Sequence, residues 1–245
     1  MTSLRLITDQ DPDPTLDTAL STALLHRVAS GEIGPTLRLF TPGRIVAFGS
    51  QDRPRPGYAT AVDAVGGLGY AAVERLAGGK AAVSHEGTIA FAWSTPHSDP
   101  LSGIEARFEA LDSIVVDALA HLGIVGSVGE VTGEYCPGRF SVHADGRKVM
   151  GVGQRLVRSA AHVGGLLVVH SPNLINRALV PAYRALGYEW SPDATGAIGG
   201  SIGDAMQALT AAFSSAGHRL TASQFEPGTL AVAANLADRH LPRIR

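Results

Sequence analysis

Cys136 is the only cysteine in this chain of 245 residues and lies in the segment Gly133-Glu-Tyr-Cys-Pro-Gly138. Lys148 follows 12 positions later, after a turn at Ala144-Asp-Gly146 and at the start of a strand-like run. A nearby ammonium group favours the thiolate of a cysteine, which is its nucleophilic form. We therefore interpret Cys136 as a candidate nucleophile and Lys148 as its candidate cation. A buried inert thiol and a solvated lysine are the alternatives.

A glycine-rich loop is the second segment that could take part in chemistry. It runs Arg75-Leu-Ala-Gly-Gly-Lys-Ala-Ala-Val-Ser-His85 and opens directly from a strand-like run. The backbone amides of such a loop can bind a phosphate or a carboxylate. The loop is not a Walker A motif, because Gly79-Lys80 is followed by Ala81 rather than by Ser or Thr.

Composition and charge exclude several classes of protein. With 45% hydrophobic and 17% charged residues, the chain is expected to fold around a substantial core. A net charge of −2 supplies no concentrated basic face, so we expect no nucleic-acid partner. The nine histidines have neither His-x-His nor His-Glu-x-x-His spacing, so we expect no metal site. No segment has the apolar length of a signal peptide or a membrane span, which predicts a cytoplasmic protein without a membrane partner.

Apolar periodicity predicts a mixture of helices and strands. Helical spacing covers residues 14–29, 59–68, 103–122, 174–186, 202–216 and 229–240. Strand-like runs cover residues 36–40, 44–49, 70–76, 88–93, 140–143, 148–157 and 162–170. The runs 36–40 and 44–49 are separated by Pro42-Gly43 and are expected to form a hairpin, and Asp145-Gly146 predicts a second hairpin.

These elements predict an α+β fold with a mixed, mainly antiparallel sheet and flanking helices. Strands and helices do not alternate strictly, which disfavours a Rossmann fold. We expect residues 1–170 to form the catalytic core and residues 171–245 to form a small helical C-terminal extension of the same domain.

Three segments, in this order, resemble the biotin/lipoate protein ligase superfamily. Residues 37–51 (LRLFTPGRIVAFGSQ) are similar to the early hairpin of lipoate-protein ligases. Residues 75–85 resemble their Arg-x-x-Gly-Gly-x-Ala-Val-x-His loop. Residues 146–155 (GRKVMGVGQR), followed by His162-Val-Gly-Gly165, resemble the Gly-x-Lys-x-x-Gly-x-x-Gln-Arg strand and the His-Gly strand after it.

Within the superfamily, Tyr135-Cys-Pro-Gly138 resembles the cysteine-dependent octanoyltransferases, particularly the amidotransferase type. The resemblance implies that Cys136 holds an acyl thioester and that Lys148 contacts the acyl carbonyl and favours the thiolate. It implies an acyl tunnel bordered by a further set of residues, namely Arg75, Gly78, Gly79, His85, Gly151, Gln154, His162, Gly164 and Gly165. Lys80 and Ser141 depart from the pattern, which usually has a small or neutral residue and an aspartate there.

The resemblance leaves three functions open. The leading one is octanoyl or lipoyl transfer to a protein lysine through a Cys136 thioester, which requires neither ATP nor a metal. An ATP-dependent lipoate-protein ligase would need Mg-ATP, and a non-catalytic lipoyl- or octanoyl-binding protein would show no turnover. The implied partners are lipoyl-domain proteins and the glycine-cleavage H protein or acyl carrier protein.

Overall fold

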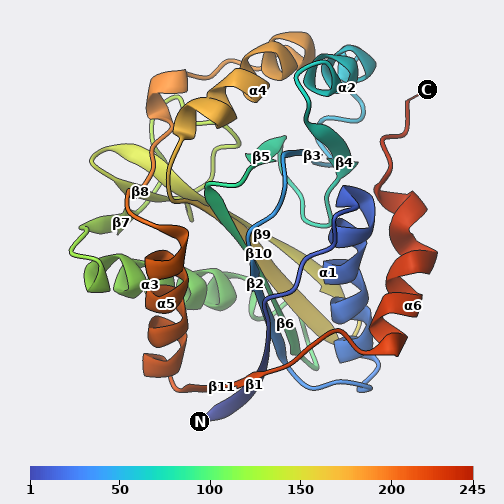
Figure 1. The fold of residues 1–245 in the computed structure, drawn as a ribbon, viewed down its shortest axis with the longest axis vertical. Helices are drawn as coiled ribbons and strands as arrows, with labels where there is room; N and C mark the ends of the chain where they lie inside the picture. The colour runs from blue at the N-terminus through green and yellow to red at the C-terminus, as the bar shows by residue number, and fades with distance from the viewer. Residues whose placement is uncertain (245) are drawn as a thin grey trace.

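The computed structural model describes residues 1–244, which form a large sheet and a small sheet flanked by helices (Figure 1). The order of strands in the large sheet is β11 (His218–Ala222), β1 (Thr2–Ile7), β2 (Thr36–Phe40), β6 (Thr88–Pro96), β10 (Ala160–Val168), β9 (Arg147–Val157), β8 (Val142–Ala144) and β7 (Gly126–Val128). Neighbouring strands from β2 to β7 are antiparallel, whereas β11, β1 and β2 are parallel. The predicted α+β fold with a mainly antiparallel sheet is confirmed.

The small sheet lies higher than the labels of strands β9 and β10 in the view of Figure 1. Its order is β4 (Ala71–Glu74), β3 (Ile45–Phe48) and β5 (Ala82–Ser84). The predicted hairpin of residues 36–40 and 44–49 is therefore wrong, because β2 pairs with β1 and β6 while β3 pairs with β4 and β5. Both strands are largely buried, so their apolar pattern suits either pairing, and Pro42-Gly43 carries the chain from one sheet to the other.

The second predicted hairpin is confirmed. Ala144 pairs with Arg147, so Asp145 and Gly146 form the whole turn between β8 and β9. Both residues have positive φ, 50° and 71°, as a two-residue hairpin of this kind requires. The turn places Lys148 near the start of β9, where its side chain points into the protein and is 1% exposed.

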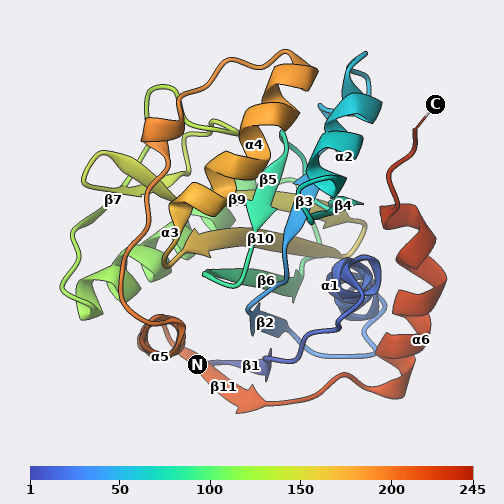
Figure 2. The same cartoon turned by 45° about the horizontal axis from the view of Figure 1, so that its top comes forward.

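The helices pack in pairs, each joining an early and a late segment of the chain (Figure 2). The pairs are α1 (Pro14–Ala29) with α6 (Pro227–Leu236), α2 (Tyr58–Gly66) with α4 (Pro172–Leu186), and α3 (Ile104–His121) with α5 (Ile202–Ser215). The segment after residue 170 thus reaches three different places on the fold, and it also supplies strand β11. The boundary at residue 170 stays a prediction.

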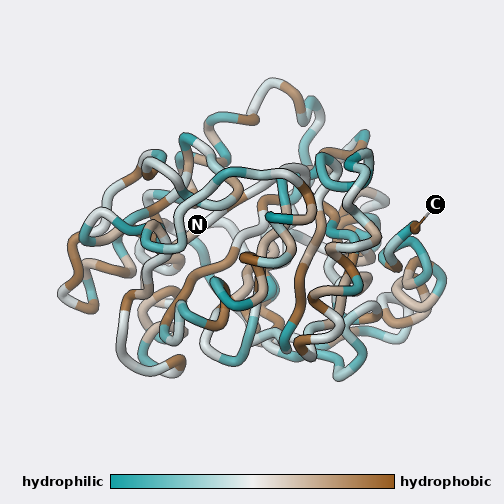
Figure 3. The backbone as a smooth tube through the Cα atoms, turned by 90° about the horizontal axis from the view of Figure 1, so that it is seen from above, coloured by the Kyte–Doolittle hydropathy of each residue, from teal (hydrophilic) through white to brown (hydrophobic). Residues whose placement is uncertain are grey.

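Apolar side chains between α3, α5 and the large sheet form one core cluster, and those between the small sheet, α2 and α4 form another. Hydrophobic stretches run through the central strands, and many outer loops are hydrophilic (Figure 3). Within residues 1–244, no helix combines the length and the apolar character needed to cross a membrane.

A buried ion pair joins α1 to β2. The Arg38 side chain is fully buried and donates to Asp17, to the carbonyl oxygen of Asp9 at 3.0 Å and to the Ser21 hydroxyl at 3.1 Å. Its guanidinium also lies 3.6 Å from the ring centroid of Phe40. A charge buried this deeply depends on its partner for compensation.

Asp17→Ala is expected to lower the free energy of unfolding by about 3–5 kcal/mol, because it leaves the buried Arg38 charge uncompensated. Urea denaturation measures the change. Glu105→Ala is the matched control, since its pair with Arg139 is exposed, and it should cost less than about 1 kcal/mol. Equal losses in the two variants would contradict a stabilising role for the Asp17–Arg38 pair.

Asp112, on α3, carries an unsatisfied buried carboxylate. The residue is 2% exposed, and within residues 1–244 neither carboxylate oxygen has a hydrogen-bond partner. Burial, together with the negative charge of Glu109, raises the pKa of Asp112 to about 7. This pKa lies above the unfolded value of about 3.9. The stability that the folded protein gains from protonation of Asp112 is therefore fully present below about pH 4. That stabilisation is lost as the pH rises through about 7.

Asp112→Asn is therefore expected to raise Tm at pH 8 by roughly 5 °C and to change it little at pH 4. Thermal unfolding at the two pH values tests this. Asp117→Asn, at an exposed position of the same helix, should shift Tm similarly at both. A gain from Asp112→Asn that did not depend on pH would rule out titration of this carboxyl as the cause.

Candidate active site

A cavity of about 490 Å³ lies between the two sheets. Strands β6, β9 and β10 of the large sheet line one side, and all three strands of the small sheet line the other. Much of its wall is aliphatic or aromatic, including Phe40, Ile45, Ala47, Val73, Val83, Phe108, Val152 and Leu166. This volume is in the range of small-molecule sites, and the wall suits an apolar ligand.

The fold brings all but one of the predicted site residues to this cavity. Those that line it are Arg75, Gly78, Gly79, Cys136, Lys148, Gly151, Gln154, His162, Gly164 and Gly165. His85 is fully buried and does not line it. Its Nδ1 accepts the N–H of Gly87 at 3.0 Å, and burial lowers the pKa of the His85 imidazole.

The thiol of Cys136 lies at the cavity wall beside the glycine loop. Its Sγ is 3.3 Å from Nη2 of Arg75 and 3.3 Å from the backbone N–H of Lys80. The same Arg75 nitrogen donates to the carbonyl oxygen of Lys80 at 2.8 Å, which holds the guanidinium in place. A cation and an amide donor in contact with the sulfur can stabilise negative charge on it during a reaction, so the geometry suits a nucleophilic cysteine.

The backbone of Cys136 adopts an unusual conformation. Its φ is 41°, a left-handed value that costs a non-glycine residue of order 1–3 kcal/mol. Tyr183 of α4 supports this conformation: its hydroxyl accepts the Cys136 N–H at 3.0 Å and donates to the carbonyl oxygen of Ala81 at 2.9 Å. Sequence reasoning missed Tyr183, because no local pattern connects a C-terminal helix with the cysteine.

Lys148 contacts the cysteine loop, but through the backbone. Its ammonium donates to the carbonyl oxygens of Tyr135 and Cys136, both at 2.9 Å, and to Glu134 at 3.1 Å. Within residues 1–244 it makes no hydrogen bond to the sulfur, so the cation in contact with the thiol is Arg75. Burial lowers the pKa of Lys148, and the charge of Glu134 opposes that shift.

Glu134 is the main site residue that sequence reasoning missed. Its fully buried carboxylate accepts from the Ser141 hydroxyl at 2.7 Å, from the N–H of Gly138 at 2.9 Å and from the N–H of Val131 at 3.1 Å, besides Lys148. Glu134 therefore connects both sides of the cysteine loop to β9. The sequence does show a carboxylate two positions before the cysteine, and this spacing could have indicated Glu134 as a site residue.

The two positions that depart from the family pattern both take part in the site. Ser141 donates to Glu134, whereas an aspartate there would face a second carboxylate. Lys80 supplies its backbone N–H to the sulfur, and its Nζ lies 4.5 Å from the ring centroid of Tyr188.

Two other polar side chains of the cavity wall are already engaged by the protein. Gln154 donates to the carbonyl oxygen of Ile104 at 2.6 Å and accepts from Arg107 at 3.0 Å. His162 lies 3.3 Å from the Ser94 hydroxyl, and burial lowers the pKa of its imidazole to about 4. His162 is therefore neutral near pH 7.

Glycine is required where the loops approach each other. Gly79 has φ +100°, and a Cβ there would lie 2.4 Å from the Arg75 guanidinium and 2.9 Å from the Cys136 sulfur. At Gly164, a Cβ would lie 2.5 Å from Nε2 of His162. These glycines keep the thiol pocket and the cavity wall free of side chains.

A segment with Gly-x-Ser-x-Gly spacing, residues 199–203, lies away from this cavity. Its Ser201 is the N-cap of α5, where its hydroxyl accepts the N–H of Asp204 at 3.1 Å. Among residues 1–244, no strand leads into this serine as it would in a nucleophile elbow, so Ser201 serves as a helix cap.

Comparison with known protein families shows the family to which this chain belongs. The family model of the lipoyl protein ligase A/B catalytic domain matches residues 13–184, which include the cysteine, the lysine and the glycine loop. The chain belongs to this family.

Similar sequences in the lipoyl protein ligase A/B family include two transferases. An octanoyl-[GcvH]:protein N-octanoyltransferase of Geobacillus kaustophilus is 28% identical over 69% of this chain and 60% of the relative. A lipoyl-[GcvH]:protein N-lipoyltransferase of Listeria monocytogenes is 24% identical over 83% of this chain and 77% of the relative. The chain thus spans about 60% of the length of the first of these relatives.

Solved structures share the fold over nearly the whole chain. Lipoate-protein ligase A bound with ATP has a TM-score of 0.81 at 18% identity and covers 98% of this chain and 95% of its own. Ta0514, a lipoate protein ligase homologue from T. acidophilum with bound lipoic acid, has a TM-score of 0.78 at 20% identity and covers 98% and 96%. The lipoyl ligase fold therefore includes the C-terminal helices of this chain.

Gly79→Ala is expected to slow alkylation of Cys136 by iodoacetamide about tenfold at pH 7, because displacing the Arg75 guanidinium removes a hydrogen bond and a positive charge from the reacting sulfur. Mass spectrometry over time measures the rate at this single cysteine. Gly78→Ala is the matched control, since a Cβ there meets nothing within 4 Å. If Gly79→Ala reacted as fast as wild type, Arg75 would not activate the thiol.

Proposed function

We propose that this chain transfers an octanoyl or lipoyl group to a protein lysine through a thioester on Cys136. The observation that carries the proposal is the position of the thiol, at the wall of a largely apolar cavity and within 3.3 Å of both Arg75 and the Lys80 amide. The names of the transferase relatives support the same activity.

The proposed reaction has two steps. The Cys136 thiol gives up its proton, the thiolate attacks the acyl carbonyl of the donor, and the bond between the carbonyl carbon and the donor's sulfur or nitrogen breaks as the thioester forms. The donor leaves as a thiol or amine and takes up the proton that the Cys136 thiol released. The amine of the acceptor lysine then attacks the thioester, the bond between the carbonyl carbon and sulfur breaks, and an amide bond forms. The proton lost by the amine returns to the thiolate or passes to solvent, which restores the free cysteine. Covalent catalysis of this kind divides one difficult transfer into two easier ones. The acyl chain occupies the apolar cavity in both steps.

In this mechanism Arg75 and the Lys80 amide stabilise the thiolate, whereas Lys148 and Glu134 position the loop that carries it. The Lys148 ammonium already has three protein acceptors, which favours a positioning role over direct contact with an activated acyl group. The acyl group arrives already activated or as an amide, so we propose that neither ATP nor a metal is required.

The proposed partners are a lipoyl-domain protein as acceptor and the glycine-cleavage H protein as donor, in line with the relatives' names. An acyl carrier protein is the other candidate donor. A reducing compartment keeps the single thiol free, so we propose that the reaction takes place in the cytoplasm.

Intact mass spectrometry after incubation with octanoylated H protein, without ATP, tests the thioester. Wild type is expected to gain one octanoyl group, and Cys136→Ala none. Cys136→Ala should keep the wild-type Tm, which serves as the folding control. A lipoyl-domain acceptor added to the wild-type acyl-enzyme should then take up the group as the enzyme loses it.

Other outcomes distinguish the remaining functions. Acceptor octanoylation that required free octanoate and Mg-ATP and survived Cys136→Ala would replace transfer with ligation. Tight octanoyl binding with no covalent adduct and no product under either condition would identify a non-catalytic binding protein.

A further inference from the structure

A second hollow, of about 550 Å³, shares a wall with the acyl cavity. Arg75, Leu76, Ala77, Gly78 and Gln154 line both spaces. The other residues that line the second hollow come mainly from α1, α6, strand β9, the small sheet and the C-terminal tail. Helices α1 and α6 lie side by side, with the C-terminal tail above α6 in the view of Figure 1; Figure 2 shows the same elements from another angle. We call this hollow the basic pocket.

Arginine side chains reach the basic pocket from five separate parts of the chain. They come from the loop after β3, the loop after β4, strand β9, the 3₁₀ turn Ala237–His240 and the tail after it, and they are Arg53, Arg75, Arg155, Arg239 and Arg243. Glu74 is the one acidic residue among the described residues that line it. Since the whole chain has a net charge of −2, this is a local excess of positive charge.

Glu74 offsets only one of these charges, because its carboxylate pairs with Arg53. It accepts from Arg53 at 3.2 Å, from the Tyr58 hydroxyl at 3.3 Å and from the backbone N–H of Arg243 at 3.0 Å.

The other guanidinium groups of the basic pocket keep their charge unpaired. Within residues 1–244, Arg155, Arg239 and Arg243 make no ion pair with a carboxylate. Two of them lie close enough to act on His26, whose pKa is lowered by burial and then by the charges of Arg239 and Arg155.

We propose that the basic pocket binds a phosphate-bearing ligand through the guanidinium groups of Arg155, Arg239 and Arg243. Guanidinium groups match the oxygen geometry of phosphate in pairs of hydrogen bonds, and several convergent ones favour a doubly charged anion. The concave shape and volume fit a small ligand or a prosthetic arm rather than the flat face of a protein. Two sources share this chemistry: a free phosphorylated metabolite, and the phosphodiester of a carrier protein's pantetheine arm.

Isothermal titration calorimetry of the full chain tests the proposal with inorganic pyrophosphate, 4′-phosphopantetheine and pantetheine. The two phosphorylated probes are expected to bind and pantetheine is not. Tighter binding of 4′-phosphopantetheine than of pyrophosphate would support the carrier arm as the source. Equal or weaker binding would support a free metabolite.

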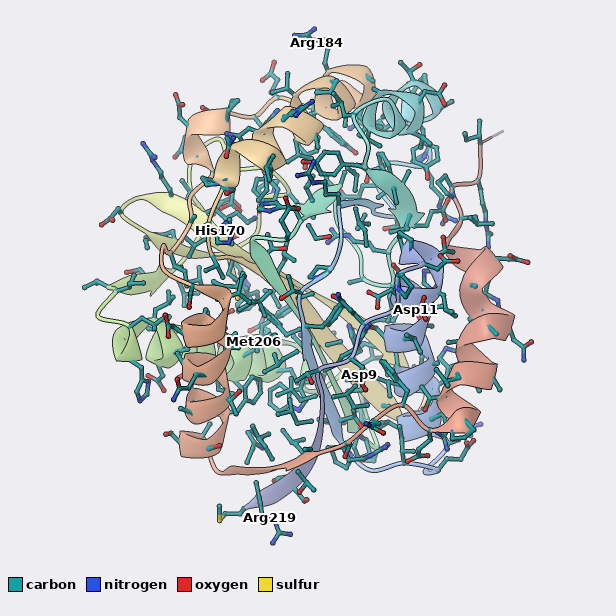
Figure 4. All side chains as sticks on the ribbon, viewed as in Figure 1. Asp9, Asp11, His170, Arg184, Met206 and Arg219 are labelled. Atoms are coloured by element: carbon teal, nitrogen blue, oxygen red, sulfur yellow. The ribbon has the colours of Figure 1, made fainter. Side chains whose placement is uncertain are left out.

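The double variant Arg155→Gln/Arg239→Gln should weaken binding of both phosphorylated probes by at least about tenfold. Arg219→Gln is the matched control, since this arginine lies in β11 and points outward (Figure 4). All the substituted arginines are exposed, so the fold should be retained.

Absence of binding by both phosphorylated probes, or equal weakening in the double variant and in Arg219→Gln, would overturn the proposal. Binding of a phosphate in the basic pocket does not involve the thiol. The result of the titration is therefore independent of whether Cys136 forms a thioester.

Discussion

The buried ammonium of Lys148 donates to Glu134 and to the carbonyl oxygens of Tyr135 and Cys136, and these contacts fasten the cysteine loop to strand β9. Removing a charge from water costs several kcal/mol, so such a group is stable only when its hydrogen bonds are satisfied. Glu134 satisfies the lysine and also accepts from Ser141 and from backbone amides of the loop. One buried ion pair thereby sets the position of the whole loop.

The position of the loop in turn decides the surroundings of the sulfur. With the backbone of Cys136 held in a left-handed conformation, its thiol points at the glycine loop and meets Arg75 and the Lys80 amide. Two cations near the thiol thus have different roles. Lys148 orders the backbone, and Arg75 supplies the positive charge in contact with the sulfur. Gly79 makes this arrangement possible, because any side chain there would occupy the space between sulfur and guanidinium.

The sequence alone predicted the six helices and most of the strands, but not β1, β5, β7 or β11, and it supplied most of the residues of the candidate site. Helical and alternating periodicity are local properties, so the helices at Pro14–Ala29 and Ile104–His121 and the Asp145-Gly146 turn could be predicted from neighbouring residues. The residues predicted from the glycine loop and from the segment around Lys148 nearly all line one cavity in the structure. His85 was the exception, since a motif position does not determine where a side chain points.

Only the tertiary structure decided how these elements pair. Strands β2 and β3 carry similar buried apolar runs, so their assignment to different sheets depends on partners far away in the sequence. The edge strand β11 and its neighbour β1 come from opposite ends of the chain, and their pairing could not be read from either end alone. The same holds for Arg75 at the sulfur and Tyr183 under the cysteine backbone, which lie 61 and 47 positions from Cys136. Contacts over such separations follow from how the sheets and helices pack, and local sequence patterns carry no information about that packing.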